Sequence, residues 1–69
     1  MNFFKAKRIE KKLSISDVVY NTNYPISVIE AIEKDKINFL PKPYAYYAAK
    51  TYAKYLNILN ADEIIKKYK

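Results

Sequence analysis

The side chains best suited to chemistry with another molecule are the tyrosines and lysines between residues 44 and 56. Tyr44, Tyr47 and Tyr55 fall on sides of a helix that its alanine-rich face leaves free, and Lys50 and Lys54 lie beside them. A tyrosine ring offers a large contact area, a polar hydroxyl and little rotamer entropy to lose, which is the profile of an interface anchor. Lysines nearby complement an acidic partner. This pattern indicates binding rather than catalysis.

Residue types that are absent from the sequence exclude most catalytic and metal-binding chemistry. There is no Cys, His, Gly or Trp. Without Cys and His there is no thiol nucleophile, imidazole base or zinc-finger ligand set. Without Gly there is no phosphate-cradling loop of the usual kinds. We therefore expect no enzyme activity, no cofactor, no metal and no small-molecule substrate.

The length and the charge describe one small basic domain. The 69 residues include 13 Lys and Arg against 7 Asp and Glu, for a net charge of +6. A chain of this size buries only about 60% of the surface that its unfolded form exposes, so it has material for one core. No apolar run approaches the roughly 18 to 20 residues that cross a bilayer, and the first residues do not form a signal peptide. We expect a single cytoplasmic domain over residues 1–69.

Apolar residues recur at spacings of three and four, and strict alternation is absent, so the sequence predicts an all-α fold. The expected helices span residues 3–12, 14–22, 25–34, 44–56 and 60–68. They form a compact five-helix bundle, in which residues 15–34 have the dimensions of a helix-turn-helix of the repressor type. Residues 36–43 contain two prolines and read as a loop that inserts Phe39 and Leu40 into the core.

Local signals predict where helices begin and end. Ser14 and Asp17 have the spacing of a capping box, and Asn60 and Glu63 repeat it. Asn57 tolerates the left-handed conformation that closes a helix. Apolar staples are expected at Leu13–Val18 and Leu59–Ile64. The residues expected to point inward are Phe4, Ile9, Leu13, Val28, Ile29, Ile32 and Tyr52.

A longer series of residues resembles a known family. It consists of Leu13-Ser14-Ile15-Ser16-Asp17-Val18-Val19, Asn21-Thr22, Ile29-Glu30-Ala31-Ile32-Glu33, Leu40-Pro41, Tyr44-Ala45 and Thr51-Tyr52-Ala53-Lys54-Tyr55-Leu56. From Phe4 to Tyr68 the chain resembles the N-terminal cytoplasmic domain of the RodZ family of bacterial cell-shape proteins. The resemblance implies a domain at the inner face of the inner membrane, as part of a longer membrane protein. It also implies docking on the actin-like filament protein MreB, partly through aromatic residues of the fourth helix.

The resemblance and the exposed positions together predict the binding residues. Tyr44 matches the first aromatic position of the family, and Ala48 matches the second in place but not in chemistry, because Tyr47-Ala48 stands where the family has Gly and an aromatic residue. The predicted contact residues are Tyr44, Tyr47, Ala48, Thr51, Lys54 and Tyr55, with Ile26, Ser27 and Glu30 at the exposed start of the third helix. The alternative interpretation is that the tyrosines only cover a small core with their hydroxyls in water.

DNA is the competing partner, as in repressor-type regulators. Residues 1–12, 37–56 and 57–69 carry +4, +3 and +1, whereas residues 13–36, which contain the helix-turn-helix, carry −2. A DNA reader places Arg, Lys, Asn or Gln at the start of its second helix. Here those positions hold Pro25, Ile26, Ser27 and Glu30, and phosphates repel a carboxylate. The sequence therefore favours a protein partner over DNA.

Arg8 and Glu33 are predicted to form a structural pair. Helix-turn-helix domains of the repressor type, which this chain resembles, often join their first and third helices by an arginine and a carboxylate, and these two residues stand at the corresponding places. If the pair is partly buried, removal of one partner leaves the other charge stranded. The alternative is two separate, solvated surface charges.

Overall fold

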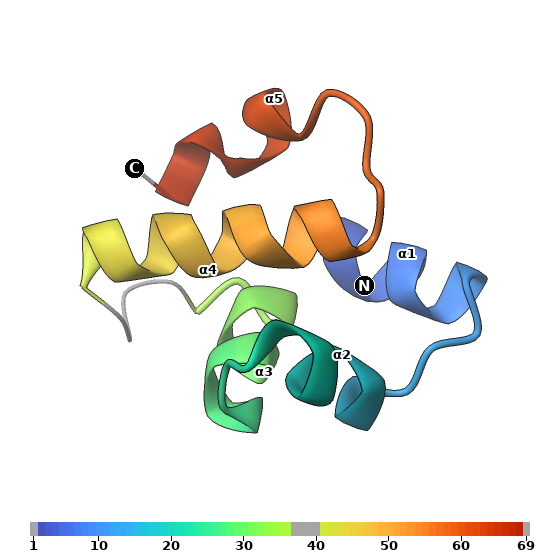
Figure 1. Ribbon diagram of the computed structural model, residues 1–69. Helices are drawn as coiled ribbons and strands as arrows, with labels where there is room; N and C mark the ends of the chain where they lie inside the picture. Colours follow the sequence, from blue (N-terminus) through green and yellow to red (C-terminus); the bar gives the residue numbers. More distant parts are fainter. Residues whose placement is uncertain (1, 37–40, 69) are drawn as a thin grey trace.

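The computed structural model describes residues 2–36 and 41–68, and these residues contain helices and turns but no strand (Figure 1). The elements in chain order are α1 (Phe3–Glu10), α2 (Ile15–Thr22), α3 (Ile26–Glu33), α4 (Lys42–Tyr55), α5 (Ala61–Ile65) and a 3₁₀ turn, η2 (Lys66–Tyr68). The described chain measures 28 × 24 × 20 Å. The predicted compact all-α fold with five α-helices, in which α2 and α3 form the helix-turn-helix, is confirmed.

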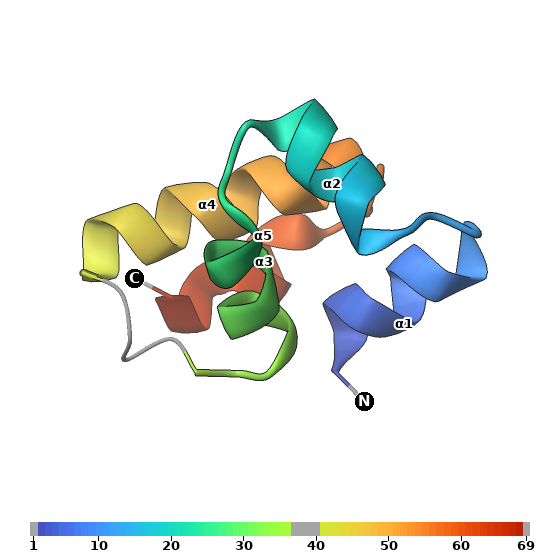
Figure 2. The same cartoon turned by 90° about the horizontal axis from the view of Figure 1, so that it is seen from below.

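Helix α4 lies at the centre of the fold. Figure 1 shows α5 on one side of α4, and α2 and α3 on the opposite side, and in the view from below in Figure 2, α2 and α3 lie in front. Its inward face is mostly alanine, which lets the neighbouring helices approach closely, and Tyr52 is its one large ring in the core. The hydrophobic core, to which α4 contributes five residues, consists of Phe4, Val18, Val28, Ile29, Ile32, Ala45, Ala48, Ala49, Tyr52, Ala53, Leu56, Ile65 and Tyr68.

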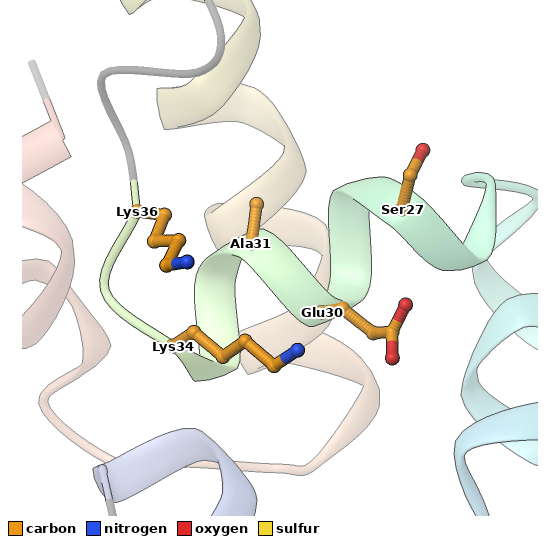
Figure 3. Close-up of a pocket in the computed structure, with 5 residues that line it drawn as sticks. All are labelled: Ser27, Glu30, Ala31, Lys34 and Lys36. Atoms are coloured by element: carbon orange, nitrogen blue, oxygen red, sulfur yellow. The ribbon is translucent and has the colours of Figure 1, made fainter.

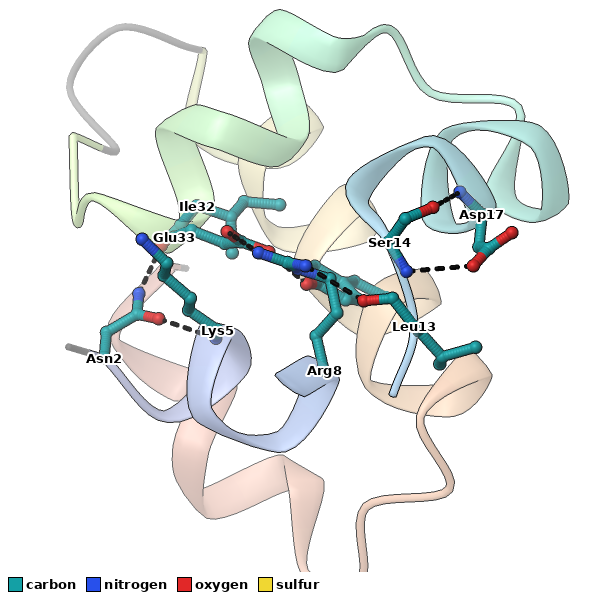
Figure 4. Close-up of polar contacts among 9 residues, drawn as sticks. Asn2, Lys5, Arg8, Leu13, Ser14, Asp17, Ile32 and Glu33 are labelled. Carbon is teal, nitrogen blue, oxygen red and sulfur yellow. Dashed lines mark hydrogen bonds and ion pairs between the residues drawn. The ribbon is translucent and has the colours of Figure 1, made fainter. Parts of the chain in front are cut away.

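The first turns of α1 and α2 are both capped, and α2 has the predicted capping box. Ser14 Oγ accepts the backbone N–H of Asp17 at 3.1 Å, and Asp17 Oδ2 accepts that of Ser14 at 2.9 Å (Figure 4). This capping box satisfies donors that a helix start leaves without partners. The Asn2 side chain accepts the Lys5 N–H at 3.0 Å in the same manner. Because both caps depend only on residues three apart, the sequence contains all that is needed to predict them.

Four helices end on a residue in the left-handed conformation, although the chain has no glycine. Lys12, Asn23, Asp35 and Asn57 have φ values of 59°, 62°, 57° and 56°. After α4, the Ile58 N–H donates to the Ala53 carbonyl at 3.1 Å, which completes a Schellman closure. The left-handed conformation expected of Asn57 is confirmed, and it turns the chain sharply at this end of α4.

The predicted start of α4 was two residues too late. α4 begins at Lys42, with Pro41 as its N-cap and Pro43 in its first turn. Proline is tolerated there because the N–H that it lacks would have no partner inside the helix. The loop prediction for residues 42 and 43 is therefore wrong, and the prediction for Phe39 and Leu40 falls outside the described residues.

Two predictions about buried apolar residues are also wrong. Asn60 adopts the left-handed conformation and makes no side-chain cap, so Leu59 is turned away from Ile64 and is 86% exposed. Ile9 follows the buried Phe4 by five residues, which is about 140° round the helix, and it points to solvent. The inward place on α1 next to Phe4 belongs to Arg8 instead.

Candidate functional site

The outer side of α4 presents a stripe of aromatic and polar side chains. Tyr44 and Tyr47 are 41% and 59% exposed, Thr51 is partly exposed, and Lys54 is exposed. These residues recur every three or four positions, so they follow one another along one side of the helix. We call Tyr44, Tyr47, Thr51 and Lys54 the α4 surface. It combines large ring area with a cation and contains no carboxylate.

Ring contacts hold the two tyrosines of the α4 surface in place. Tyr44 packs edge-to-face on Tyr24, which precedes α3, with ring centroids 5.7 Å apart. Tyr47 packs on Tyr46 with centroids 5.4 Å apart. Edge-to-face pairs of this kind are favourable beyond their buried area. The rings are therefore partly ordered before any partner arrives, which lowers the entropy cost of binding.

Tyr55 contributes less of its ring to the surface than the sequence suggested. It is partly buried against the core, and its hydroxyl accepts a hydrogen bond from Asn21 Nδ2 of α2 at 3.2 Å. Thr51 Oγ1 donates to the Tyr47 carbonyl at 2.9 Å, so its methyl group and hydroxyl are fixed on the helix. Tyr55 thus joins α2 to α4 and is only partly accessible to a partner.

Ala48 is the one predicted contact residue that the structure contradicts. It is completely buried in the core, between helices that pack on α4. It follows Tyr44 by four residues, so it lies about 40° further round the helix, towards the alanine face. A partner cannot reach it without opening the bundle.

The predicted α3 residues lie at the surface at the start of that helix. Ile26 is 49% exposed, Ser27 is exposed, and Glu30 is half-buried. Pro25 precedes them as the N-cap and makes no side-chain cap hydrogen bond. Because Tyr24 contacts Tyr44, the segment that leads into α3 lies against the first turn of α4. The structure thus brings the start of α3 close to one end of the α4 surface.

A shallow hollow on α3 was not predicted. It has a volume of about 220 Å³ and is lined by Ser27, Glu30, Ala31, Lys34 and Lys36 (Figure 3). Small-molecule sites usually enclose about 300 to 1,000 Å³. The hollow also mixes a carboxylate with two ammonium groups, so it favours neither an anion nor a cation. No pattern of spacings predicts this hollow, because Lys36 reaches it only through the turn that follows α3.

Arg8 and Glu33 form a bidentate ion pair. Arg8 Nε donates to Glu33 Oε2 at 2.8 Å, and Arg8 Nη2 donates to Oε1 at 3.3 Å. Their side chains are only 12% and 5% exposed. Arg8 Nη1 also donates to the Leu13 carbonyl at 3.0 Å (Figure 4). The hydrogen bond to Glu33 raises the pKa of Arg8 above its ordinary value.

Tyr52 completes this buried cluster, and sequence reasoning did not foresee it. The Tyr52 hydroxyl donates to Glu33 Oε2, and its ring packs on Phe4 with centroids 5.0 Å apart. Burial, followed by the bond to the Glu33 carboxylate, raises the pKa of Tyr52 well above its usual range. Arg8, Glu33 and Tyr52 therefore tie α1, α3 and α4 together. We call these three residues the buried polar cluster, and its role is structural.

The residues that the structure describes contain neither a candidate metal site nor a candidate membrane span. Residues 2–36 and 41–68 contain no group of three or more Asp and Glu side chains that could hold a metal ion. Within the same residues, no helix combines the length and the apolar character needed to cross a membrane.

Comparison with known protein families finds a match over most of the chain. A family model described as a helix-turn-helix domain matches residues 3–64, which span α1 to α4 and nearly all of α5. A search of curated proteins and a search of solved structures each found no match.

Proposed function

Because the chain belongs to the helix-turn-helix domain family, whose members bind DNA or proteins, we propose that it is a non-enzymatic adaptor that binds a protein through its α4 surface. One observation carries the proposal: Tyr44 and Tyr47 are exposed on α4, whereas the first turn of α3 offers Ile26 instead of a base-reading side chain. The proposed partner is the bacterial actin homologue MreB. That choice follows from the resemblance of the chain to the RodZ family.

The α4 surface supports this proposal by its chemistry. Exposed tyrosines are enriched among the residues that carry most of the binding energy of interfaces. α4 also contains Lys42, Lys50 and Lys54 and no carboxylate, so the helix complements an acidic surface and would speed encounter with it. In our proposal the rings bury against a filament subunit and the lysines set the orientation. The adaptor thereby couples the filament to the inner membrane and to cell-wall synthesis, which controls cell shape.

DNA binding by α3 is the competing proposal, since the helix-turn-helix family and the net charge of +6 are both compatible with it. The side chains at the start of α3 argue against it. Ile26 offers no hydrogen bond to a base edge, and Glu30 would be repelled by phosphates. Lys34 and Lys36 follow the C-terminal end of α3, away from the N-terminal residues that contact base edges in the major groove in such domains.

Co-sedimentation with polymerised MreB tests the proposal directly. The protein should pellet with the filaments and should show little affinity for duplex DNA at moderate salt. The two arms are repeated over a series of salt concentrations, because DNA binding weakens steeply with salt as counterions are released, and a tyrosine-centred interface weakens less. Tight, strongly salt-dependent DNA binding without filament binding would contradict this proposal and favour a DNA-binding regulator of the repressor type.

Single substitutions locate the contact. Tyr44→Ala and Tyr47→Ala should each weaken filament binding by about 1 to 2 kcal/mol, or roughly five- to thirty-fold in the dissociation constant. Tyr20→Ala is the matched control, because Tyr20 is 81% exposed but lies on α2, on the side away from the buried Val18. If the α4 variants bind as well as Tyr20→Ala does, another face of the protein makes the contact.

A further inference from the structure

A second exposed apolar patch lies at the opposite end of α4 from Tyr44. Phe3 and Leu59 are 41% and 86% exposed, and they line one hollow of about 330 Å³ together with Ile58. Lys7 and Lys11 of the α1 segment line the same hollow. Figure 1 shows α1 close to the α4–α5 connection, where α4 ends. We call Phe3, Lys7, Lys11, Ile58 and Leu59 the α1 patch.

The turn that carries Leu59 is fixed by its backbone. Asn57 and Asn60, on either side of Ile58 and Leu59, both adopt the left-handed conformation. Hydrogen bonds from the backbone N–H groups of Asn57 and Ile58 anchor the turn to the last carbonyls of α4. Leu59 is therefore held outward at the tip of a defined turn, at the cost of leaving a leucine in water.

Positive charge surrounds these apolar side chains. Lys7 Nζ lies 5.8 Å from the centre of the Phe3 ring and 3.3 Å from Glu10 Oε2. Lys11 makes no ion pair with any residue that the structure describes. The segment 1–12 carries +4, whereas residues 13–36, on the α2–α3 side, carry −2. The field of the protein therefore turns the α1 patch towards a negative surface.

We propose that the α1 patch docks on a bilayer surface that contains anionic phospholipids. An apolar tip beside two lysines, Lys7 and Lys11, has the composition of interfacial membrane-binding sites, where apolar groups enter the boundary of the acyl chains and lysines attract the headgroups. A lipid surface suits the patch better than a peptide does, because Leu59 protrudes from a turn and does not line a long groove. The contact is peripheral and reversible.

The placement of this patch is compatible with binding at the α4 surface. α4 has 14 residues, so its two ends are about 20 Å apart. The Tyr44 end can face a protein while the Leu59 end faces lipid. The lipid proposal does not depend on the partner of the α4 surface, and its test contains no filament and no DNA.

Vesicle co-sedimentation tests this proposal with the 69-residue chain. The protein is mixed with vesicles of phosphatidylcholine alone and with vesicles that also contain phosphatidylglycerol. It should pellet with the anionic vesicles, less so as salt rises, and hardly at all with the neutral ones. Leu59→Ser should lower partitioning onto anionic vesicles by about tenfold, since the apolar anchor is lost. Phe3→Ala should act in the same direction, and Tyr20→Ala should change nothing.

Three results would overturn the proposal. The first is an absence of binding to anionic vesicles at low salt. The second is binding that is indifferent to Leu59→Ser, which would reduce the contact to the general attraction of a basic protein. The third is a protein that self-associates through Leu59 without any vesicle binding, which would make the patch an interface between copies of the chain. Thermal melts check that the Leu59→Ser variant is folded. We expect an unchanged melting temperature, because the exposed Leu59 contributes little to the core.

Discussion

Tyr47 and Tyr52 stand five residues apart on α4 and have opposite environments. Tyr52 is fully buried and its hydroxyl donates to Glu33, whereas Tyr47 is 59% exposed and its ring rests on Tyr46. Five residues amount to about 140° of rotation, which separates the core side of the helix from its outer side. The phase of the helix, and not the residue type, decides which tyrosine builds the fold and which one is offered to a partner.

The two environments differ in what a substitution should cost. In the buried polar cluster, every change strands a charge or a polar atom away from water, and such losses are large. On the α4 surface, truncation of a ring exposes little new area, so the free energy of unfolding should change little. Substitutions that compare the two sides therefore test whether the buried polar cluster and the α4 surface are separate in function.

Arg8→Ala should have the largest effect. It leaves the Glu33 carboxylate, which is 5% exposed, without its cation, and we expect a loss of about 3 to 5 kcal/mol in the free energy of unfolding. That is a large part of the stability of a domain this small, so the variant should melt far below the parent or fail to fold. Denaturant titration followed by circular dichroism measures the loss.

Lys7→Ala is the matched control for Arg8→Ala. It breaks an ion pair on the same helix, but the side chains of Lys7 and Glu10 are 37% and 66% exposed. Exposed pairs contribute less than about 1 kcal/mol. Similar losses in both variants would mean that the Arg8–Glu33 pair is as weak as a surface pair. The double variant Arg8→Ala/Glu33→Gln should lose less than the sum of its single changes, because the stranded charge is gone.

Tyr52→Phe should have the next largest effect. It keeps the ring that packs on Phe4 and removes only the hydroxyl that donates to Glu33. A hydrogen bond to a charged group contributes about 1.5 to 3 kcal/mol, so the free energy of unfolding should fall by that amount. Tyr55→Phe, which removes a hydroxyl bonded to the exposed Asn21, should cost under about 1 kcal/mol. Equal costs would show that burial does not strengthen the Tyr52 bond.

Sequence reasoning predicted well the features that depend on short spacings. The capping box at Ser14 and Asp17 and the left-handed Asn57 follow from residues a few positions apart. The helix-turn-helix was predicted in the same way, because apolar spacings of three and four and the capping box at Ser14 place α2 and α3 without knowledge of the rest of the fold.

The features that failed depend on contacts between helices or were assigned by analogy with the family. The same type of capping pattern at Asn60 and Glu63 predicted a staple by Leu59, but the closure of α4 at Asn57 and the left-handed Asn60 turn Leu59 outward. Ala48 was assigned to the surface by analogy of position, although its phase on α4 places it in the core. The Tyr52–Glu33 bond joins α4 to α3, and no local spacing contains that information.

Alkaline pH should weaken the fold through its buried tyrosines. Burial, with a smaller contribution from the charge of Asp35, raises the pKa of Tyr68 to about 12, and the pKa of Tyr52 is also raised. In the unfolded chain a tyrosine titrates near pH 10, so the unfolded state releases its protons first as the pH rises. The contribution of each buried tyrosine to the free energy of unfolding is therefore complete below about pH 10. Above that pH it falls by about 1.4 kcal/mol per pH unit for each proton.

Tyr68→Phe tests the contribution of one of these hydroxyls to the pH dependence of stability. Denaturant midpoints of the variant and of the parent should run parallel with pH below about pH 9, and the parent should fall more steeply between about pH 10 and 12. Parallel curves over the whole range would show that Tyr68 titrates alike in the folded and unfolded chain, contrary to its 1% exposure.

Tyr47→Ala should have the smallest effect on stability and thereby gives the sharpest contrast with Tyr52. Its ring is 59% exposed and its described ring contact is with Tyr46, so the free energy of unfolding should change by less than about 0.5 kcal/mol. The same variant should lose about tenfold in filament binding, because an interface anchor contributes only when a partner covers it. A large loss of stability would place Tyr47 in the fold with Tyr52. Unchanged stability together with weaker binding is the outcome that separates the two sides of α4.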